Sequence, residues 1–393
     1  MEDEEPPRLL EVSSPEPEAG PSTSSKDQYD RPKIPLTLLT GYLGAGKSTL
    51  LDYILKEEHG YKIAVCMNDF GDTTDIEAKS LTLSDPNSQQ TTTEFLSLPN
   101  GCLCCSFKDM GIAAIEEMVA NAPGGIDWVM VELTGVADPG PIVRSFWANE
   151  EMGDLILDGV VCVVDSRNVQ KQLAEQRDGD EINECQKQVA CADVILLNKL
   201  DLVTKDQMKE VESTIRTINP TLKVHHTTHS RMPLSDLFNL RAFSDPTAIT
   251  SAQQQDDDHV NEHKHDGEEC SHPSHIKTES HTNGIKTVLI PLPLLNQEQY
   301  LRLNEFLESL LWESKILPSK SPSPEILRSK GYILLEDGRE YVLQGVADLF
   351  ELKELPDISN QAGTSDDNNG KVVFIGKGVG EEIKNALIDF VGI

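Results

Sequence analysis

The sequence predicts an α/β protein in which a mainly parallel sheet is followed by a smaller α+β unit. From residue 34 to about residue 243, short apolar runs alternate with helix-like segments. Buried strands that alternate with helices are typical of a parallel sheet. After a polar break, a strand, a helix, a pair of strands, another strand and a terminal helix follow. That order indicates a small sheet covered on one face by helices.

The individual elements are expected at the following positions. In the parallel sheet, the apolar runs predict strands at 34–40, 62–67, 128–133, 159–164 and 194–197. The helices expected between them are 47–58, 110–120 and 182–190. In the smaller unit we expect strands at 287–290, 332–335, 340–344 and 371–375, the middle two joined by the turn Asp337-Gly338. Helices are expected there at 296–313 and over the C-terminal residues.

Composition divides the chain into four segments. Residues 1–33 are rich in Glu, Pro and Ser, which predicts a disordered acidic tail. Residues 34–245 and 285–393 are expected to form the two folded domains. Residues 246–284 between them are rich in Gln, Asp, His and Ser. Because this composition is too polar to bury a core, we expect a flexible linker.

Charge and hydropathy exclude two classes of partner. The 393 residues carry a formal net charge of -32, which argues against a nucleic-acid ligand. No stretch reaches the roughly 20 apolar residues of a membrane helix, and the N-terminus lacks the features of a signal peptide. We therefore expect a cytoplasmic or nuclear protein whose eight cysteines are thiols or metal ligands rather than disulfides.

Residues 41–48 match the phosphate-binding pattern G-x-x-x-x-G-K-[ST], between an expected strand and an expected helix. Glycines let backbone N–H groups approach phosphate oxygens, and the helix N-terminus adds partial positive charge. Lys47 is expected to pair with the β- and γ-phosphates, and the Ser48 hydroxyl to ligate Mg²⁺. The alternative, a chance glycine-rich turn, does not account for the strand–loop–helix context. The residues expected to bind nucleotide here are Gly41, Tyr42, Leu43, Gly44, Ala45, Gly46, Lys47 and Ser48.

A second nucleotide motif, N-K-x-D, follows the apolar run at 194–197 and consists of Asn198, Lys199, Leu200 and Asp201. It stands at the carboxyl end of a strand, where α/β sheets bind ligands. The Asp201 carboxylate can accept hydrogen bonds from the ring N–H and the exocyclic amine of guanine. Adenine lacks that amine, so the motif predicts GTP rather than ATP. The alternative is an ordinary strand-to-helix turn with Asp201 as the helix N-cap.

Two carboxylates complete the expected catalytic set with Lys47 and Ser48. Glu132 ends the strand at 128–133, so it can hold Mg²⁺ through a water molecule. Gly135, soon after, can bring its N–H to the γ-phosphate. Asp69 follows the strand at 62–67 and is a further candidate near the metal or the attacking water. Without the phosphate loop, Glu132 would be interpreted as a solvent-facing strand end.

Three cysteines, Cys102, Cys104 and Cys105, lie within four residues of one another. Such spacing is too tight for three inert core thiols, and three thiolates bind Zn²⁺ or Cu(I) well. Because three ligands do not close a tetrahedral structural site, one position stays open for a labile ligand, which suits a metal that must leave again. The alternative is a redox-sensing or incidental cluster.

The other cysteines and the histidines give weaker signals. Cys66 and Cys162 lie in apolar strands and are expected in the core, while Cys185 and Cys191 lie on or near a helix. The polar linker is either a flexible collector of metal ions or a solvated loop that binds metal loosely. Its potential ligands are His259, His263, His265, Cys270, His272, His275 and His281.

Together, the phosphate loop, the segment Asn-Gly-Cys-Leu-Cys-Cys at 100–105, Glu132 and N-K-x-D resemble the CobW-type P-loop GTPases. The match is closest to the eukaryotic branch of zinc-regulated GTPase metalloprotein activators. Residues 327–331, Leu-Arg-Ser-Lys-Gly, resemble the Arg-x-Lys-Gly element of the C-terminal domain of that family. The resemblance covers roughly residues 34 to 392, and its motifs are specific in combination.

The resemblance implies a P-loop GTPase domain followed by a CobW-type C-terminal α+β domain. It implies a GTP-hydrolysing zinc metallochaperone that uses GTP, Mg²⁺ and Zn²⁺ and transfers zinc to a client apo-metalloprotein. In the family the three cysteines bind zinc, and the residues corresponding to Cys105, Ser106, Phe107 and Lys108 approach the nucleotide. Turnover is expected to be slow, because no arginine in the sequence is an evident catalytic group. The alternatives are a chaperone for cobalt or nickel, a non-catalytic zinc buffer, or a P-loop kinase acting on a small molecule.

Two departures from the family pattern bear on function. The family commonly has Asn-Glu after its second strand, whereas this chain has Asn68-Asp69, with a shorter carboxylate. Some animal members carry a Cys-Pro-Glu-Leu motif that docks a type 1 methionine aminopeptidase. The nearest stretch here, Ser-Pro-Glu-Pro at 14–17, lacks both the Cys and the Leu. The sequence therefore argues against that client.

Overall fold

The computed structural model describes residues 32–57, 60–66, 78–83, 92–97, 110–122, 125–177, 181–243, 284–317, 324–355 and 369–393. The chain divides into residues 1–33 and a unit of residues 34–393, and the features below lie in the second of these. None of the helices in the described part of the chain has the length and apolar character of a membrane span. The expected acidic tail and the linker at 246–284 fall almost wholly outside the described residues.

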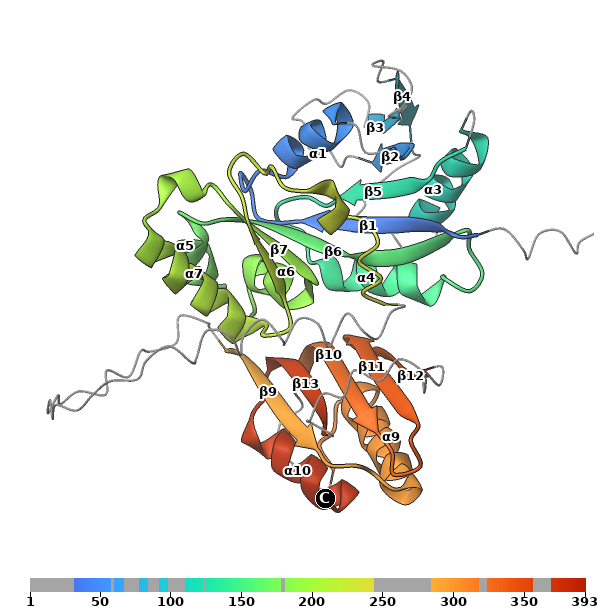
Figure 1. Ribbon diagram of the computed structural model, residues 1–393, viewed down its shortest axis with the longest axis vertical. Coiled ribbons are helices and arrows are strands. Elements are labelled where there is room, and N and C mark those ends of the chain that lie inside the picture. The colour runs from blue at the N-terminus through green and yellow to red at the C-terminus, as the bar shows by residue number, and fades with distance from the viewer. Residues whose placement is uncertain are drawn as a thin grey trace, which may run out of the picture. The chain divides into compact units, whose positions relative to one another are not determined.

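An eight-stranded sheet forms the first part of this unit (Figure 1), with strand order β4-β3-β2-β5-β1-β6-β7-β8. Apart from the antiparallel β3 and β4 at one edge, neighbouring strands are parallel. The mainly parallel sheet is therefore confirmed. The strands are β1 (Ile34–Thr40), β2 (Ile63–Cys66), β3 (Ala78–Leu83), β4 (Thr92–Ser97), β5 (Trp128–Glu132), β6 (Leu155–Asp165), β7 (Val194–Asn198) and β8 (Lys223–His226).

Helices pack on both faces of this sheet because successive strand residues point to opposite sides. In β1, Leu38 packs in one apolar cluster with α3 and α4, and the next residue, Leu39, packs in another with α1. A third cluster joins β6 and β7 to α5, α6 and α7. The helices are α1 (Lys47–Lys56), α3 (Met110–Asn121), α4 (Pro139–Ala148), α5 (Val169–Leu173), α6 (Glu184–Cys191) and α7 (Lys205–Ile218).

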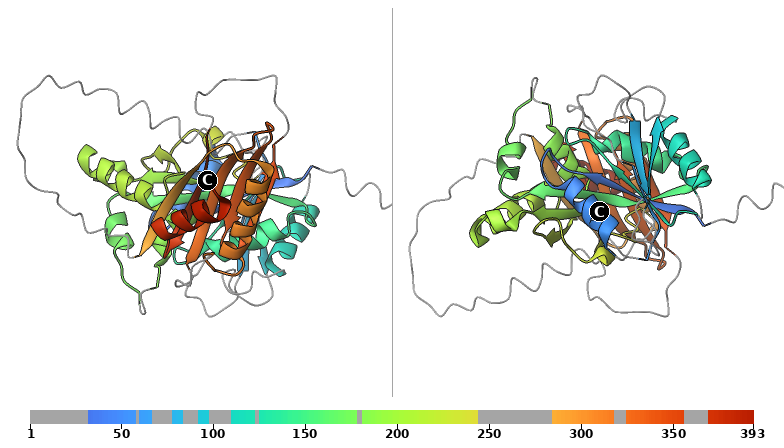
Figure 2. Two further views of the ribbon diagram at one scale, coloured as in Figure 1. Left: turned by 90° about the horizontal axis from the view of Figure 1, so that it is seen from below. Right: turned by 90° about the horizontal axis from the view of Figure 1, so that it is seen from above.

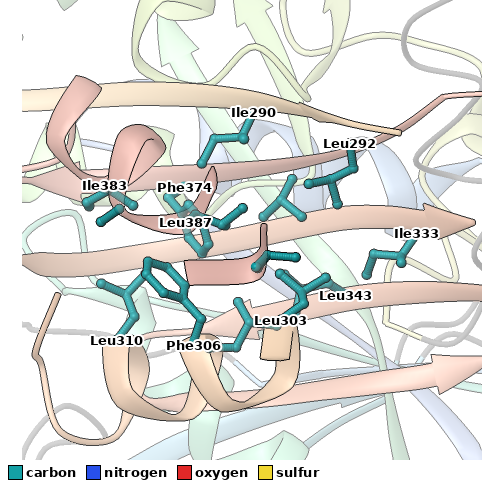
Figure 3. Packing of buried hydrophobic residues seen from close by; sticks show 14 of the residues in the cluster. Ile290, Leu292, Leu303, Phe306, Leu310, Ile333, Leu343, Phe374, Ile383 and Leu387 are labelled. Carbon is teal, nitrogen blue, oxygen red and sulfur yellow. The ribbon is translucent and has the colours of Figure 1, made fainter. Parts of the chain in front are cut away.

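A five-stranded antiparallel sheet, ordered β12-β11-β10-β13-β9, forms the second part. Two helices, α9 (Gln297–Leu311) and α10 (Glu381–Val391), lie across one of its faces (Figure 2). Phe306 of α9 and Leu387 of α10 point into the core that they share with Phe374 (Figure 3). The predicted α+β arrangement is thus confirmed. The strands are β9 (Ile285–Leu292), β10 (Glu325–Leu334), β11 (Glu340–Val346), β12 (Leu349–Glu354) and β13 (Gly370–Lys377).

The opposite face of the five-stranded sheet packs against the first sheet's helices. Leu327 of β10 and Val373 and Ile375 of β13 lie in one apolar cluster with residues of α6 and α7. The predicted strand at 332–335 began too late, because β10 already starts at Glu325. Its first half is rich in polar residues, which the pattern did not predict to be buried, yet Arg328 and Lys330 are buried against the first sheet's helices.

Candidate nucleotide-binding site

The predicted phosphate loop joins the end of β1 to the start of α1. Gly46 precedes the helix with a left-handed φ of 117°, and a Cβ there would lie 2.5 Å from Nδ2 of Asn198. Both facts require glycine. Lys47 is buried, and its Nζ donates to the carbonyl oxygen of Gly41 at 2.7 Å. Burial lowers the pKa of the Lys47 ammonium, and the nearby Glu132 opposes this. A buried ammonium held by loop carbonyls suits a polyphosphate ligand.

The candidate magnesium residues are brought together from two elements. Ser48 lies in the first turn of α1, and Glu132 is the last residue of β5. The Ser48 hydroxyl donates to Oε1 of Glu132 at 3.5 Å, and Glu132 is only 9% exposed. An adjacent hydroxyl and carboxylate supply the oxygen ligands that Mg²⁺ prefers. When bound, the ion would neutralise charge on the phosphates; Ser48 and Glu132 would hold it.

The loop after β5, residues 133–138, lies directly against the phosphate loop. A Cβ on Gly135 would meet the backbone nitrogen of Leu43 at 2.7 Å and its side chain at 2.6 Å, so no other residue fits. The loop is held from the other side by Gln188 of α6. The Gln188 Nε2 donates to the carbonyl oxygens of Gly135 and Ala137, at 3.2 and 3.1 Å. The Gly135 backbone is thus held between the phosphate loop and α6.

Asn198 of N-K-x-D braces three loops. It is the last residue of β7 and is 2% exposed. Its Nδ2 donates to the carbonyl oxygen of Ala45 at 3.0 Å and to Oγ of Ser230 at 2.9 Å. Its Oδ1 accepts from the Ser230 N–H at 2.9 Å and from the Thr227 hydroxyl at 3.2 Å. The phosphate loop, the N-K-x-D turn and the segment after β8 are therefore fixed to one side chain.

Lys199 links the same motif to a further strand end. Its Nζ donates to the Gly44 carbonyl oxygen at 2.6 Å and to Oδ2 of Asp165, the last residue of β6, at 2.7 Å. Burial alone would raise the pKa of the Asp165 carboxyl, but hydrogen bonds from Lys199 and Asn168 hold it below its ordinary value. Lys199 therefore connects the phosphate loop to the end of β6.

Asp201 lies in a short 3-10 helix, Leu200–Leu202, and is exposed. The alternative that it caps the following helix is wrong. Thr204 is the N-cap of α7, in a capping box with Gln207. The Asp201 carboxylate does not cap α7 and is exposed, which fits its expected role of accepting hydrogen bonds from guanine.

Several residues of this site were not predicted. Asp165 ends an apolar strand, as Asn198 does, so its position at the sheet edge could have indicated it. Ser230 and Thr227 lie in a polar turn, and Gln188 is a single buried polar residue of α6, so neither place carries a sequence signal. Left-handed backbone at Ser230, with φ of 55°, turns its N–H toward Asn198.

The predicted thiolate site and the groups beside the nucleotide lie outside the described residues. These are Asp69, Cys102, Cys104, Cys105, Ser106, Phe107 and Lys108, together with the histidines of the linker. Within the described ranges, no three His, Cys, Asp or Glu side chains gather as a metal site. Cys66 and Cys162 are buried, as predicted. Burial raises the pKa of Cys185 and of Cys191 to about 12, and both thiols lie in the core.

This geometry defines a P-loop protein built to bind a guanine nucleotide with Mg²⁺. Residues 35–226 match the CobW/HypB/UreG nucleotide-binding domain, and residues 299–391 match the cobalamin synthesis protein cobW C-terminal domain. Zinc-regulated GTPase metalloprotein activator 1 of Schizosaccharomyces pombe is 33% identical over 349 residues, which cover 88% of this chain and 82% of that protein. The Saccharomyces cerevisiae protein of the same name is 32% identical over 396 residues, with 93% and 85% covered. The chain belongs to this family of P-loop GTPases.

A solved structure agrees with this assignment. A triple mutant of the Zn(II)-bound YjiA GTPase superimposes with a TM-score of 0.63 and 26% sequence identity. The superposition covers 91% of this chain and 99% of that one. YjiA of Escherichia coli is named a zinc chaperone and is 36% identical to this chain over 214 residues, 53% of this chain and 62% of that protein.

Proposed function

We propose that this protein is a GTP-hydrolysing zinc metallochaperone, in which the nucleotide state controls transfer of zinc to a client metalloprotein. Zinc is the cargo, held by the thiolates of Cys102, Cys104 and Cys105. GTP and Mg²⁺ occupy the site built by Lys47, Ser48 and the strand ends. The zinc-related names of the relatives support this choice of metal. Cobalt or nickel would bind three soft thiolates less readily.

One observation carries the link between zinc and nucleotide. Helix α3 begins at Met110, shortly after the three cysteines. Its residues Ile112 and Ile115 lie in the same apolar cluster as Leu133 and Ala137, which belong to the loop against the phosphate site. Because packed cores transmit displacement, a shift of that loop on GTP binding would reach the segment that carries the thiolates.

The chemistry is the attack of water on the γ-phosphorus of GTP, which yields GDP and inorganic phosphate. Lys47 would neutralise charge on the β- and γ-phosphates, and the Gly135 N–H would bind a γ-phosphate oxygen. We place Asp69 beside the attacking water, and Cys105, Ser106, Phe107 and Lys108 beside the nucleotide. Loss of the γ-phosphate would release the loop and loosen the zinc site. A client in the cytosol or nucleus, where thiols stay reduced, fits such a donor.

Zinc affinity measured with a GTP analogue and with GDP tests this proposal. We expect zinc to bind at least about fivefold more tightly in the GTP-analogue complex than in the GDP complex, since a coupling of that size is typical of linked sites. Cys104→Ala combined with Cys105→Ala should abolish tight zinc binding and keep GTP binding. Cys185→Ala is the matched control, because that thiol is buried elsewhere in the core. Equal zinc affinity in both nucleotide states would favour a zinc buffer instead.

A further inference from the structure

Helix α6 contacts the loop beside the nucleotide site through two consecutive residues, Lys187 and Gln188. Gln188, 1% exposed, donates both hydrogen bonds that hold the carbonyl oxygens of Gly135 and Ala137. One residue earlier, the Lys187 ammonium lies 3.1 Å from Oδ2 of Asp138, the N-cap of α4. The whole loop from Gly135 to Asp138 is therefore attached to α6. A displacement of this loop must either move the helix or break buried hydrogen bonds.

The segment directly after α6 is attached to the five-stranded sheet. Asp193 follows the helix, and its Oδ1 accepts from Arg328 at 2.7 Å and from Lys330 at 2.9 Å. Its Oδ2 accepts from the Val160 N–H in β6 at 3.0 Å. The side chains of Asp193, Arg328 and Lys330 are buried, and so is Val160. The Arg328 guanidinium lies 4.5 Å from the centre of the Phe243 ring. One carboxylate thus holds two cations of β10.

Both termini of α6 are also held by hydrogen bonds from neighbouring segments. Asn183 caps its start and donates to the carbonyl oxygens of Leu173 and Glu175. At its end, Asn219 donates to the carbonyl oxygens of Val189, Ala190 and Ala192. Gln188 and Asp193 are close in the chain, and Asn219 holds the backbone between them in shape, so a displacement at Gln188 reaches Asp193.

The charge balance at Asp193 leaves room for a second arrangement. Two cations share one carboxylate oxygen, while Nε and Nη1 of Arg328 have no hydrogen-bond partner in the described parts of the chain. Buried guanidinium N–H groups without partners are costly. A small shift of α6 could therefore redistribute the pairing of Arg328 and Lys330 instead of simply breaking it.

We propose that α6 couples the nucleotide state to the docking of the five-stranded sheet. Gln188 is the positioning residue that moves with the 133–138 loop. Asp193 is the contact through which the position of α6 reaches Arg328 and Lys330. The proposal rests on the guanine-nucleotide site described above but not on zinc delivery. Because coupling is reciprocal, weakening the sheet's attachment must change the preference of the site for GTP over GDP.

The test measures the ratio of the dissociation constants for GDP and a non-hydrolysable GTP analogue, on the metal-free full-length chain. Asp193→Asn lies away from the nucleotide, yet it should change this ratio by at least about fivefold. Arg144→Gln is the matched control. Arg144 also pairs with the second sheet, through Asp348 at 3.0 Å, but this pair is exposed and does not involve α6. The control should stay within about twofold of the wild-type ratio.

A mutant cycle then assigns the route. If Gln188 carries the coupling, Asp193→Asn should have no further effect on the ratio in a Gln188→Leu background. An effect of Asp193→Asn that is absent, equal to that of Arg144→Gln, or undiminished by Gln188→Leu would overturn the proposal.

A second measurement needs only the wild-type chain, in case Asp193→Asn does not fold. Amide hydrogen exchange over α6 and β10 should differ between the GDP and analogue complexes, and equal protection would also overturn the coupling. Zinc affinity that ignores the nucleotide would refute the proposed function and leave this inference standing. An unchanged GDP-to-analogue ratio would do the reverse.

Discussion

Stability offers a quantitative check on the buried charges between the two sheets. Asp193→Asn would leave the ammonium of Lys330 and the guanidinium of Arg328 buried with no carboxylate in contact. Breaking a buried pair in this way costs about 3–5 kcal/mol. Lys330→Met removes a cation instead and leaves Arg328 paired with Asp193 at 2.7 Å. Burial already lowers the pKa of Lys330, so we expect this change to cost less than about 1 kcal/mol or to stabilise the fold.

The assay is urea unfolding followed by far-ultraviolet circular dichroism, with free energies of unfolding compared for the wild type and the two variants. Arg144→Gln, which removes an exposed pair, should cost no more than about 1 kcal/mol and sets the scale for a surface contact. A cost for Lys330→Met that equals or exceeds the cost for Asp193→Asn would refute the reasoning. It would mean that the two cations contribute independently rather than competing for one carboxylate.

Further outcomes follow from the site. Burial alone would raise the pKa of the Asp193 carboxyl, but its two cations hold that pKa below the ordinary value. The extra stability of the wild type over Asp193→Asn should therefore be complete above about pH 4 and be lost as the pH falls through the lowered pKa. Urea titrations at stepped pH measure this difference in the free energy of unfolding. Asn198→Ala should weaken GTP binding at least about tenfold in a fluorescent-nucleotide assay, because it removes the side chain that bridges the loops; undiminished affinity would contradict the brace. Gly135→Ala should lower the rate of GTP hydrolysis at least about tenfold, because the added methyl collides with Leu43; a wild-type rate would show that the loop does not approach the phosphates. Lys47→Ala should abolish hydrolysis in a phosphate-release assay, and unaltered turnover would exclude the phosphate-loop assignment.

Local pattern predicted most of the fold. Apolar runs and turn residues identified the central strands, because a parallel strand buried on both faces is apolar along its length. The start of β10 was missed for a non-local reason. Arg328 and Lys330 are hydrophilic side chains, and they are buried only because Asp193, far away in sequence, faces them. The antiparallel strands β3 and β4 lie at a sheet edge and have mixed composition, so they gave no apolar run.

In the candidate site, too, local sequence motifs predicted some residues, while others depend on contacts between distant segments. Gly46, Lys47 and Asn198 belong to motifs whose residue types are set by the chemistry of phosphate and base, so the sequence alone identifies them. Gln188 and Ser230 act through hydrogen bonds to backbone groups of distant segments. Any residue type that reaches the same carbonyl or amide could take such a place, and therefore no motif marks it. Their roles become visible only when the loops are brought together by the sheet.

The hydrogen bonds of Asn198 bear on which parts of the nucleotide site are fixed and which can move. One amide ties the base-recognition turn to the phosphate loop, so that wall is already assembled before a nucleotide arrives, and little ordering remains to oppose binding there. The loop at Gly135, which lies against Leu43, is hydrogen-bonded instead to α6, and the segment after this helix contacts the five-stranded sheet. On the proposed function, guanine would be selected by the part of the site that Asn198 holds together, and the third phosphate would be sensed by the loop that contacts α6.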